Sequence, residues 1–172
     1  MRRAAYWISG PWLGHLAIIP RPRGGDWLGD EVRALKDLGL NIVVSLLTRE
    51  EIIEFELAEE EQWCQAQGIQ FHTLAIPDRG VPESRQAVAD LIETLMKALE
   101  AGKSIGVHCR QGIGRSSVVA ALLLVSAGEG PDTALAHISQ ARGCPVPDTP
   151  EQANWIKGFA VLTDLRQELR IQ

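Results

Sequence analysis

The sequence predicts a single α/β domain built on a central, mostly parallel sheet with helices on both faces. Two observations favour this fold class. Short apolar runs alternate with segments of helical periodicity in the order β-α-β-α-β-α-β-α-α-α, which is typical of parallel sheets covered by helices. The 172 residues are 45% hydrophobic and 23% charged, a composition that supports one buried core without covalent cross-links. We therefore expect one domain over residues 1–172, in which residues 1–25 supply a strand or edge segment.

Four short apolar runs predict the strands, and capping signals predict the helices between and after them. The run NIVVSLL is rich in β-branched residues and is typical of a strand buried on both faces. The strands are expected at residues 16–20, 41–47, 69–76 and 104–108. The helices are expected from Asp26 as N-cap to Leu38, over 48–68 with one break, from Ser84 as N-cap to about Ala101, from about Arg115 to Ala127, and over 132–142 and 150–170.

The overall charge and the cysteines limit the possible partners and location. The net charge of −5 offers no global attraction to nucleic acid or to an anionic membrane surface, so an anionic ligand needs a local site. The three cysteines show no paired spacing, which favours a reducing compartment over a disulfide framework. Residues 1–15 make a poor signal peptide, and the longest apolar run, 118–127, is too short to span a bilayer. We expect a cytoplasmic protein without nucleic-acid or membrane partners.

The stretch HCRQGIGRS has the composition of an anion-binding loop around a thiol. In sheets of this kind the ligand site lies beyond the carboxyl ends of the strands, where the loops after Leu47, Ile76 and His108 should meet. Glycines in the turn allow successive N–H groups to point inward, and the following helix adds its positive N-terminus. Cys109 is therefore expected to be a thiolate at neutral pH, and Arg115 offers a planar fork that matches phosphate oxygens.

The pattern of His-Cys, five residues and Arg-Ser resembles the signature of the cysteine-based protein tyrosine phosphatase superfamily, in particular its dual-specificity-like members. Two further segments extend the resemblance over roughly residues 40–160. The segment IPDRGVP resembles the general-acid loop of that superfamily, with Asp78 in the acid position. The segment VPDTPEQ is similar to one in which a glutamine, here Gln152, orients water.

The resemblance implies a phosphotyrosine phosphatase-like fold and a metal-independent phosphomonoester hydrolase that works through a phosphocysteine, without any cofactor. Cys109 would attack phosphorus, while Asp78 would protonate the leaving group and later activate water. Ser116 would donate a hydrogen bond to the sulfur, and His108 would hold the cysteine from behind. A phosphate or sulfate-like anion would lie in the loop formed by Arg110, Gln111, Gly112, Ile113, Gly114 and Arg115. The substrate would be a phosphorylated protein or a small phosphomonoester.

Two other functions remain open on sequence grounds. A phosphate-binding module would hold phosphorylated partners without turnover, although Cys109, Arg115, Ser116 and Asp78 are all present. A rhodanese-like sulfurtransferase also has a loop that runs from cysteine to arginine, but its usual loop is shorter. Gln111 and Ile113 stand where lipid and inositol phosphatases tend to have lysines, which favours a singly phosphorylated substrate such as phosphotyrosine.

Several of these residues also have ordinary structural interpretations. Pro-Asp-x-Gly is common turn chemistry, so Asp78 could be structural. Thr149 and Gln152 form a helix capping box, which explains the glutamine without catalysis. The acidic run at 54–62 is expected to be a solvated helix face, and Cys144 could serve as a redox partner of Cys109.

Overall fold

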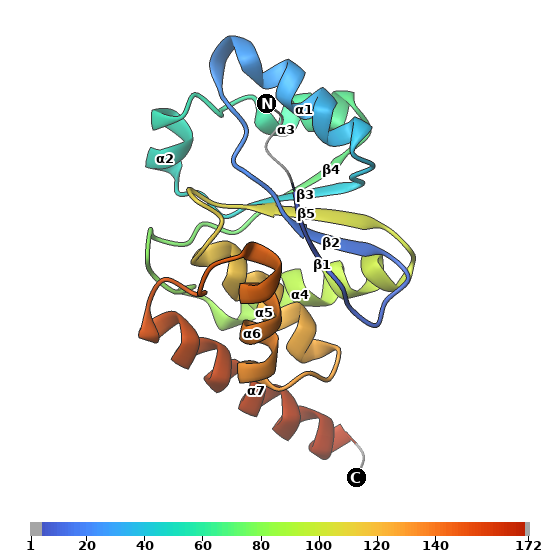
Figure 1. Ribbon diagram of the computed structural model, residues 1–172, viewed down its shortest axis with the longest axis vertical. Coiled ribbons are helices and arrows are strands. Elements are labelled where there is room, and N and C mark those ends of the chain that lie inside the picture. Colours follow the sequence, from blue (N-terminus) through green and yellow to red (C-terminus); the bar gives the residue numbers. More distant parts are fainter. Residues whose placement is uncertain (1–4, 171–172) are drawn as a thin grey trace.

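The computed structural model describes residues 5–170, in which five strands form one sheet between two layers of helices (Figure 1). The order of the strands across the sheet is β1-β2-β5-β3-β4. Their bounds are β1 (Tyr6–Ile8), β2 (His15–Ile18), β3 (Ile42–Ser45), β4 (Gln70–Thr73) and β5 (Ser104–His108). The four strands predicted from the sequence are confirmed: β3, β4 and β5 lie at or within their expected ranges, and β2 begins one residue before the expected 16–20.

The sheet is parallel except at one edge. Strands β2, β5, β3 and β4 pair in parallel, whereas β1 pairs with β2 in the antiparallel direction. The central strand is β5, where Val107 lies opposite Ile18 on one side and Val44 on the other. Strand β1 falls inside the expected N-terminal edge segment, and it has only three residues. Cys109 follows directly after β5 and so lies at the carboxyl edge of the sheet.

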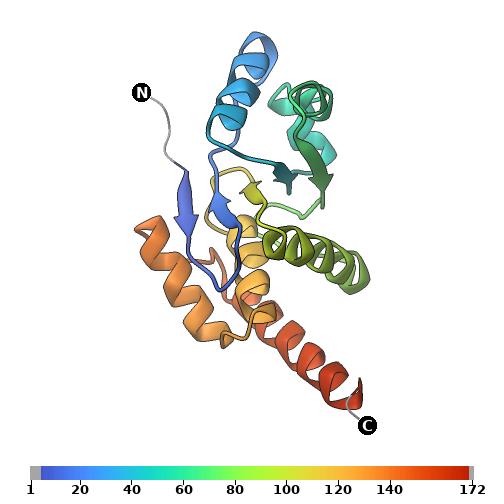
Figure 2. The ribbon, with the colours of Figure 1, turned by 90° about the vertical axis from the view of Figure 1, so that its right-hand side faces the viewer.

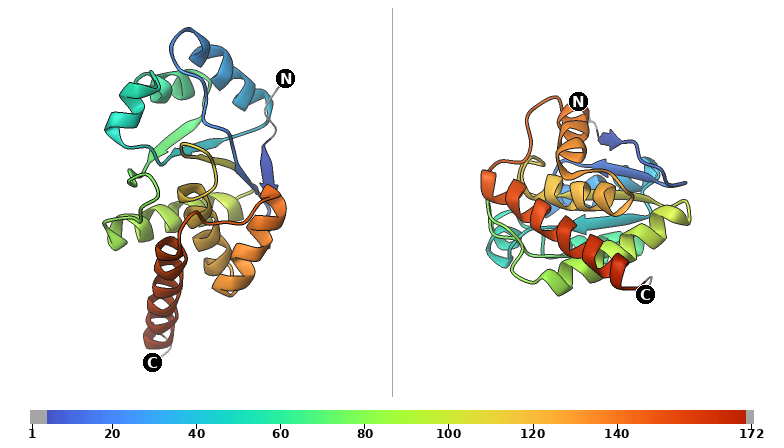
Figure 3. Two further views of the ribbon diagram at one scale, coloured as in Figure 1. Left: turned by 60° about the vertical axis from the view of Figure 1, so that its left-hand side comes forward. Right: turned by 90° about the horizontal axis from the view of Figure 1, so that it is seen from below.

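Each face of the sheet is covered by its own group of helices (Figure 2). The smaller layer packs against the sheet through Leu28, Val32 and Cys64. It contains the 3-10 turn η1 (Gly25–Trp27), α1 (Leu28–Asp37), α2 (Arg49–Glu54) and α3 (Glu60–Ala66). The larger layer contains α4 (Arg85–Glu100), α5 (Arg115–Ser126), α6 (Pro131–Arg142) and α7 (Pro150–Arg170). Helix α7 projects away from the sheet (Figure 3).

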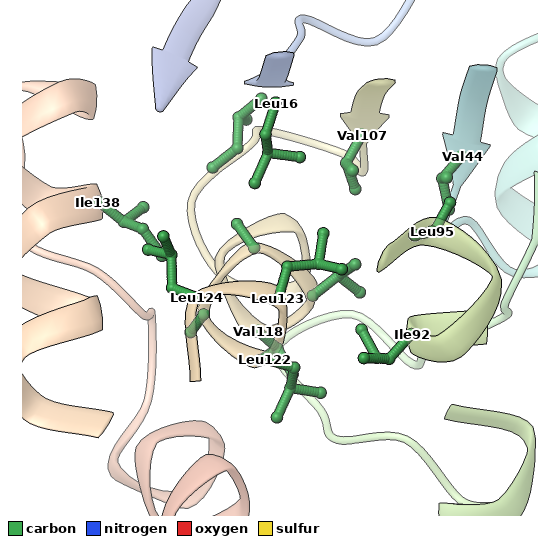
Figure 4. Packing of buried hydrophobic residues seen from close by; sticks show 14 of the residues in the cluster. Leu16, Val44, Ile92, Leu95, Val107, Val118, Leu122, Leu123, Leu124 and Ile138 are labelled. Carbon is green, nitrogen blue, oxygen red and sulfur yellow. The ribbon is translucent and has the colours of Figure 1, made fainter. Parts of the chain in front are cut away.

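Helix α5 lies at the centre of the larger layer and fixes the position of the cysteine loop. All of its residues from Arg115 to Leu124 are buried, because the sheet and the other helices of the layer surround it. Figure 4 shows Leu122, Leu123 and Leu124 directed toward different neighbours around this helix. A helix that is apolar on all sides belongs in a core, so its first turn is held rigidly beside β5.

One of the predicted helix starts is wrong, whereas a predicted break and a predicted cap are confirmed. Asp26 does not cap the first helix: it lies within η1, and α1 begins at Leu28 without any side-chain cap. The segment 48–68 is broken once, as predicted, between α2 and α3, where Glu56 has a φ of 55°. Ser84 caps α4 as expected, since its hydroxyl accepts from the N–H of Ala87. Within residues 5–170 no helix combines the length and apolarity that crossing a membrane requires.

Candidate active site

The loop from Cys109 to Arg115 wraps around the sulfur of the cysteine. Cys109 is buried, with 3% of its surface exposed. Its Sγ accepts a hydrogen bond of 3.2 Å from the N–H of Gly112. Gly112 has a φ of 68°, a left-handed conformation that glycine adopts without steric cost. The loop therefore directs at least one backbone donor at the position where negative charge is needed.

Arg115 connects the three loops that the sequence predicted to meet at this edge. Its Nη1 donates to the carbonyl of Ile76 at 2.8 Å and approaches that of Leu46 at 3.4 Å. Its Nη1 and Nη2 also form a two-pronged pair with the carboxylate of Glu51, at 2.7 and 2.8 Å. The guanidinium is only 2% exposed, so the charge is held in one orientation beside the loop.

The charges of this pair stabilise each other. Burial opposes the charged form of Arg115, but the hydrogen bond with Glu51 and the negative charges of Cys109, Glu51 and Asp78 raise its pKa. Burial would likewise raise the pKa of Glu51, yet the hydrogen bonds from Arg115 and Thr48 and the charges of Arg115 and Arg110 lower it. Both groups are therefore ionised at neutral pH.

Glu51 is a residue of the site that the sequence analysis did not single out. It forms a capping box with Thr48: the Thr48 N–H donates to Glu51 Oε2, and the Glu51 N–H donates to Thr48 Oγ1. This box fixes the carboxylate at the start of α2, immediately beyond β3. The motif Thr-x-x-Glu after a buried strand was the available signal, although it did not reveal the partner.

Asp78, the predicted general acid, forms an ion pair with Arg115. Its Oδ1 accepts from Arg115 Nη2 at 3.2 Å, and its side chain is half exposed, at 52%. The turn that holds it is closed by the N–H of Gly80, which donates to the carbonyl of Pro77. Arg79, between them, has a φ of 58°, in the left-handed region that is unfavourable for a non-glycine residue.

Gln152, in the segment VPDTPEQ, makes a hydrogen bond to the loop that holds Asp78. It is fully buried, and its Nε2 donates to the carbonyl of Gly80 at 2.9 Å, while its Oε1 accepts from the N–H of Asp148 at 3.0 Å. Its own N–H donates to Thr149 Oγ1, so the predicted helix cap exists. Because both polar atoms of the side chain are used within the protein, this geometry favours a positioning role for Gln152.

Asp148 also reaches the cysteine loop, and the sequence analysis assigned it no role. Its Oδ2 and the Nε2 of Gln152 both lie where a Cβ atom on Gly114 would point. A side chain at Gly114 would overlap both groups, which explains glycine at this position. The signal for Asp148 was present in the quoted segment VPDTPEQ, but its approach to the loop depends on the tertiary fold.

The expected solvated acidic face at 54–62 is wrong for Glu60. Its carboxylate is 2% exposed and lies 2.7 Å from Nε2 of the fully buried His108. The imidazole directly before Cys109 is thus held by helix α3 from the opposite face of the sheet to α5. This contact gives His108 a buried partner that the helical charge pattern did not reveal, while its support of Cys109 stays a prediction.

Ser116 lacks the contact expected of it, and Arg110 is paired with a carboxylate at the rim of the loop. Ser116 is fully buried, and within residues 5–170 its hydroxyl has no hydrogen-bond partner, so the expected bond to the sulfur is not formed in this structure. Arg110 is half-buried at the rim, where it donates to Glu54 at 3.1 and 3.3 Å and lies over the ring of Phe55.

A small cavity of about 90 Å³ lies over the cysteine. Of the six predicted phosphate-binding residues, Arg110, Gln111, Gly114 and Arg115 line it. Gly112 and Ile113 are not part of the lining, and the Ile113 side chain packs against the core. The complete lining consists of Asp78, Arg79, Cys109, Arg110, Gln111, Gly114, Arg115 and Asp148. Across the described residues, no group of three or more His, Cys, Asp or Glu side chains is placed to hold a metal ion.

This fold and this loop define the class of cysteine-based phosphatases. Residues 7–163 match the family model described as "PTP-SAK: Swiss Army Knife protein, DSP-PTPase phosphatase domain". The match covers most of the chain, and the chain belongs to this family of dual-specificity-like phosphatase domains.

Two curated relatives also match this chain. The chain is 29% identical over 131 residues to cyclin-dependent kinase inhibitor 3 of Rattus norvegicus, covering 75% of this chain and 61% of the relative. It is 34% identical over 80 residues to the probable protein tyrosine phosphatase type IVA A of Dictyostelium discoideum, covering 45% and 48% of the two chains. The chain thus spans less than two thirds of the length of these relatives.

The solved structures show the fold. Kinase-associated phosphatase, with serine in place of its catalytic cysteine, superposes with a TM-score of 0.81 at 22% identity, covering 92% of this chain and 94% of that one. The phosphatase PTPMT1 in complex with PI(5)P gives a TM-score of 0.75 at 20% identity, covering 94% and 99%.

We expect Glu51→Gln to destabilise the protein and to impair the site, because it leaves the buried Arg115 charge without its two-pronged carboxylate partner. The loss should be about 3–5 kcal/mol at neutral pH. The folded-state pKa of Glu51 lies below its ordinary value of 4.5, so its stabilisation is complete above pH 4.5 and is lost as the pH falls through the lower value. Urea unfolding from neutral to acidic pH measures this.

The matched control is Glu50→Gln, at an exposed carboxylate on the same helix, which should leave the unfolding free energy nearly unchanged. The difference between wild type and Glu51→Gln should shrink below pH 4.5. A Glu51→Gln protein as stable as the Glu50→Gln control at pH 7 would show that the pair does not hold Arg115.

Proposed function

We propose that this protein hydrolyses phosphomonoesters through a phosphocysteine formed on Cys109, without a metal, and that its substrates are phosphorylated proteins. One observation supports this above all: the sulfur lies at the floor of a small cavity, with the Gly112 N–H directed at it and the Arg115 guanidinium at its edge. Membership of the phosphatase family supports the same activity.

The hydrogen bonds of Arg115 indicate which of its donors would meet a phosphoryl group. Nη1 is used by Glu51 and by the carbonyl of Ile76, and one Nη2 proton is used by Glu51. The other Nη2 proton goes to Asp78, and none of these bonds uses Nε–H. A phosphate that took Nε–H and this Nη2 proton would be gripped at two oxygens and would release the Asp78 carboxyl group.

In the first step the Cys109 thiolate attacks phosphorus, an S–P bond forms, and the bond from phosphorus to the leaving oxygen breaks. Asp78, in its protonated form and released from Arg115, gives its proton to that oxygen. The loop N–H groups and Arg115 stabilise the charge on the equatorial phosphoryl oxygens in the transition state. The products of this step are the free alcohol or phenol and a phosphocysteine.

In the second step water attacks the phosphocysteine, and the S–P bond breaks. Asp78, now ionised, accepts a proton from the attacking water. Inorganic phosphate leaves and the thiolate is restored. Gln152 keeps Asp78 in place by holding the carbonyl of Gly80, two residues further along the same loop. In this proposal His108 and Ser116 support the loop and do not touch the substrate.

The cavity favours a substrate with a single phosphate group. Its volume of about 90 Å³ is well below the ~300–1,000 Å³ of pockets that enclose a whole small ligand. It therefore admits the phosphoryl group and leaves the rest of the substrate at the surface. Two aspartates, Asp78 and Asp148, also line it, and Glu54 pairs with Arg110 at the rim. These carboxylates disfavour a polyphosphorylated headgroup by charge repulsion.

The relatives also support phosphoproteins as substrates, because one is named a protein tyrosine phosphatase and another a kinase-associated phosphatase. PTPMT1, solved with PI(5)P, makes a monophosphorylated lipid the second substrate to test. We place the protein in the cytoplasm in this proposal, since Cys64, Cys109 and Cys144 are free thiols in the structure.

We expect the wild type to hydrolyse 4-nitrophenyl phosphate and a phosphotyrosine peptide in the presence of a chelator. Cys109→Ser should lose turnover by roughly 10³-fold or more, because a neutral hydroxyl is a poor nucleophile, while it retains peptide binding. Cys144→Ser, at a half-buried thiol outside the cavity lining, is the control and should keep full activity.

Binding of the phosphopeptide by the wild type without any turnover would instead favour a phosphate-binding module. Transfer of sulfur from thiosulfate to cyanide would favour a rhodanese-like enzyme. A phosphatidylinositol monophosphate hydrolysed faster than the peptide would contradict the proposed substrate class.

We expect Asp78→Asn to slow the hydrolysis of aryl phosphates with poor leaving groups by about 10²–10⁴-fold, and of those with good leaving groups far less. The reason is that a good leaving group needs little protonation in the transition state. A series of substituted phenyl phosphates measures this difference. Asp132→Asn, at a carboxylate that is 84% exposed, serves as the matched control. Equal losses across the series would mean that Asp78 is a structural residue only.

A further inference from the structure

The outer side of the phosphate loop is contacted by an arginine that the mechanism does not use. Arg142 is the last residue of α6. Its Nε donates to the carbonyl oxygen of Gly112 at 2.6 Å, and its Nη2 approaches that of Gln111 at 3.5 Å. Its guanidinium also lies over the ring of Tyr6 in β1, 3.9 Å from the ring centre. Helix α6 and strand β1 pack side by side, which brings these residues together (Figure 2).

The two carbonyl contacts determine where two N–H groups point. In a trans peptide the C=O and the N–H of the same unit face opposite directions. The Gln111 carbonyl faces Arg142, and the N–H of the same peptide unit, on Gly112, points to Cys109 Sγ at 3.2 Å. The Gly112 carbonyl also faces Arg142, so the N–H of the next unit, on Ile113, is turned away from the arginine.

We propose that Arg142 is a positioning residue that holds two successive peptide units of the loop with their N–H groups directed at the anion, and that Tyr6 keeps its guanidinium in place. The proposal rests on the proposed function in that the anion is a phosphoryl group. The binding of any tetrahedral oxyanion, however, tests it without turnover.

Glycine makes this support necessary. Gly112 has a φ of 68° and lacks the side chain that would restrict the rotation of its peptide units. A rotated unit would present a carbonyl oxygen to the phosphoryl oxygens, which repels where the N–H attracts. Arg142 opposes that rotation by binding both carbonyl oxygens from outside. Because carbonyl oxygens carry no net charge, these contacts leave the positive charge of the guanidinium behind the loop, where it further favours an anion.

Tyr6 gives the edge strand β1 a part in the site. Its ring lies on the face of the guanidinium, which leaves the edge of the planar fork available for the carbonyl oxygens. The apolar ring also limits the rotation of a long, flexible side chain. The contact requires the aromatic face and not the hydroxyl, so Tyr6→Phe should preserve it and Tyr6→Leu should not.

Calorimetry of the full chain, with Cys109 intact, measures its affinity for inorganic tungstate and so tests the proposal. We expect Arg142→Ala to weaken tungstate binding about tenfold or more, the scale of a lost charged hydrogen bond. Arg142→Lys should recover only part of the affinity, because it keeps the charge without the fork. Millimolar guanidinium should restore binding to Arg142→Ala, an effect that a purely structural role would not produce. Tyr6→Leu should weaken binding and Tyr6→Phe should not.

The matched control is Arg85→Ala. It removes an arginine that is stacked on Trp155 in a similar way but does not contact the loop. This variant should bind tungstate like the wild type. If Arg142→Ala does not fold, Arg142→Lys and Tyr6→Leu carry the test. Unchanged tungstate affinity in the folded variants would overturn the proposal, and so would a loss in Arg142→Ala that guanidinium does not restore. A wild type that binds tungstate but hydrolyses no phosphomonoester would contradict the proposed function and not this role of Arg142.

Discussion

Burying the guanidinium of Arg115 beside the cysteine loop costs several kcal/mol of hydration, and the pair with Glu51 is what opposes that cost. An uncompensated charge at this depth would move toward solvent, and the loops that donate carbonyl oxygens to it would lose a common partner. With Glu51 on one edge, the guanidinium has a single orientation. Its remaining donors then face Asp78 and the cavity over Cys109. The geometry of the site therefore depends on this ion pair.

Both helical layers support the same short loop from opposite sides of the sheet. The smaller layer contributes Glu51 to Arg115 and Glu60 to the imidazole that precedes Cys109. The larger layer contributes the rigid helix α5, and Arg142 contacts the outer carbonyl oxygens. A loop whose glycines allow many conformations is thereby held in the one that binds an anion. Preorganisation of this kind places donors before the charge develops, so the transition state does not have to orient them.

The features that the sequence predicted correctly are those that depend on residues close together along the chain. Alternating apolar runs predicted the strands, and the spacing from Cys109 to Arg115 predicted the loop, because both patterns act within a few residues. The partners of that loop could not be predicted in the same way. Glu60 has the sequence context of a solvated helix face, yet it is buried against His108, since only the tertiary fold brings α3 behind β5. The capping box of Glu51 could likewise be read from the sequence, but its ion pair with Arg115 could not.

The most direct test of the account is to look for the covalent intermediate. A phenyl phosphate labelled with ³²P would be mixed with the protein, quenched in acid within one turnover, and the digested chain analysed by mass spectrometry. The account predicts label on a single peptide, at Cys109, that appears before free phosphate and decays as phosphate is released. Hydrolysis of the substrate without label on Cys109, or with label on another residue such as Ser116, would contradict it.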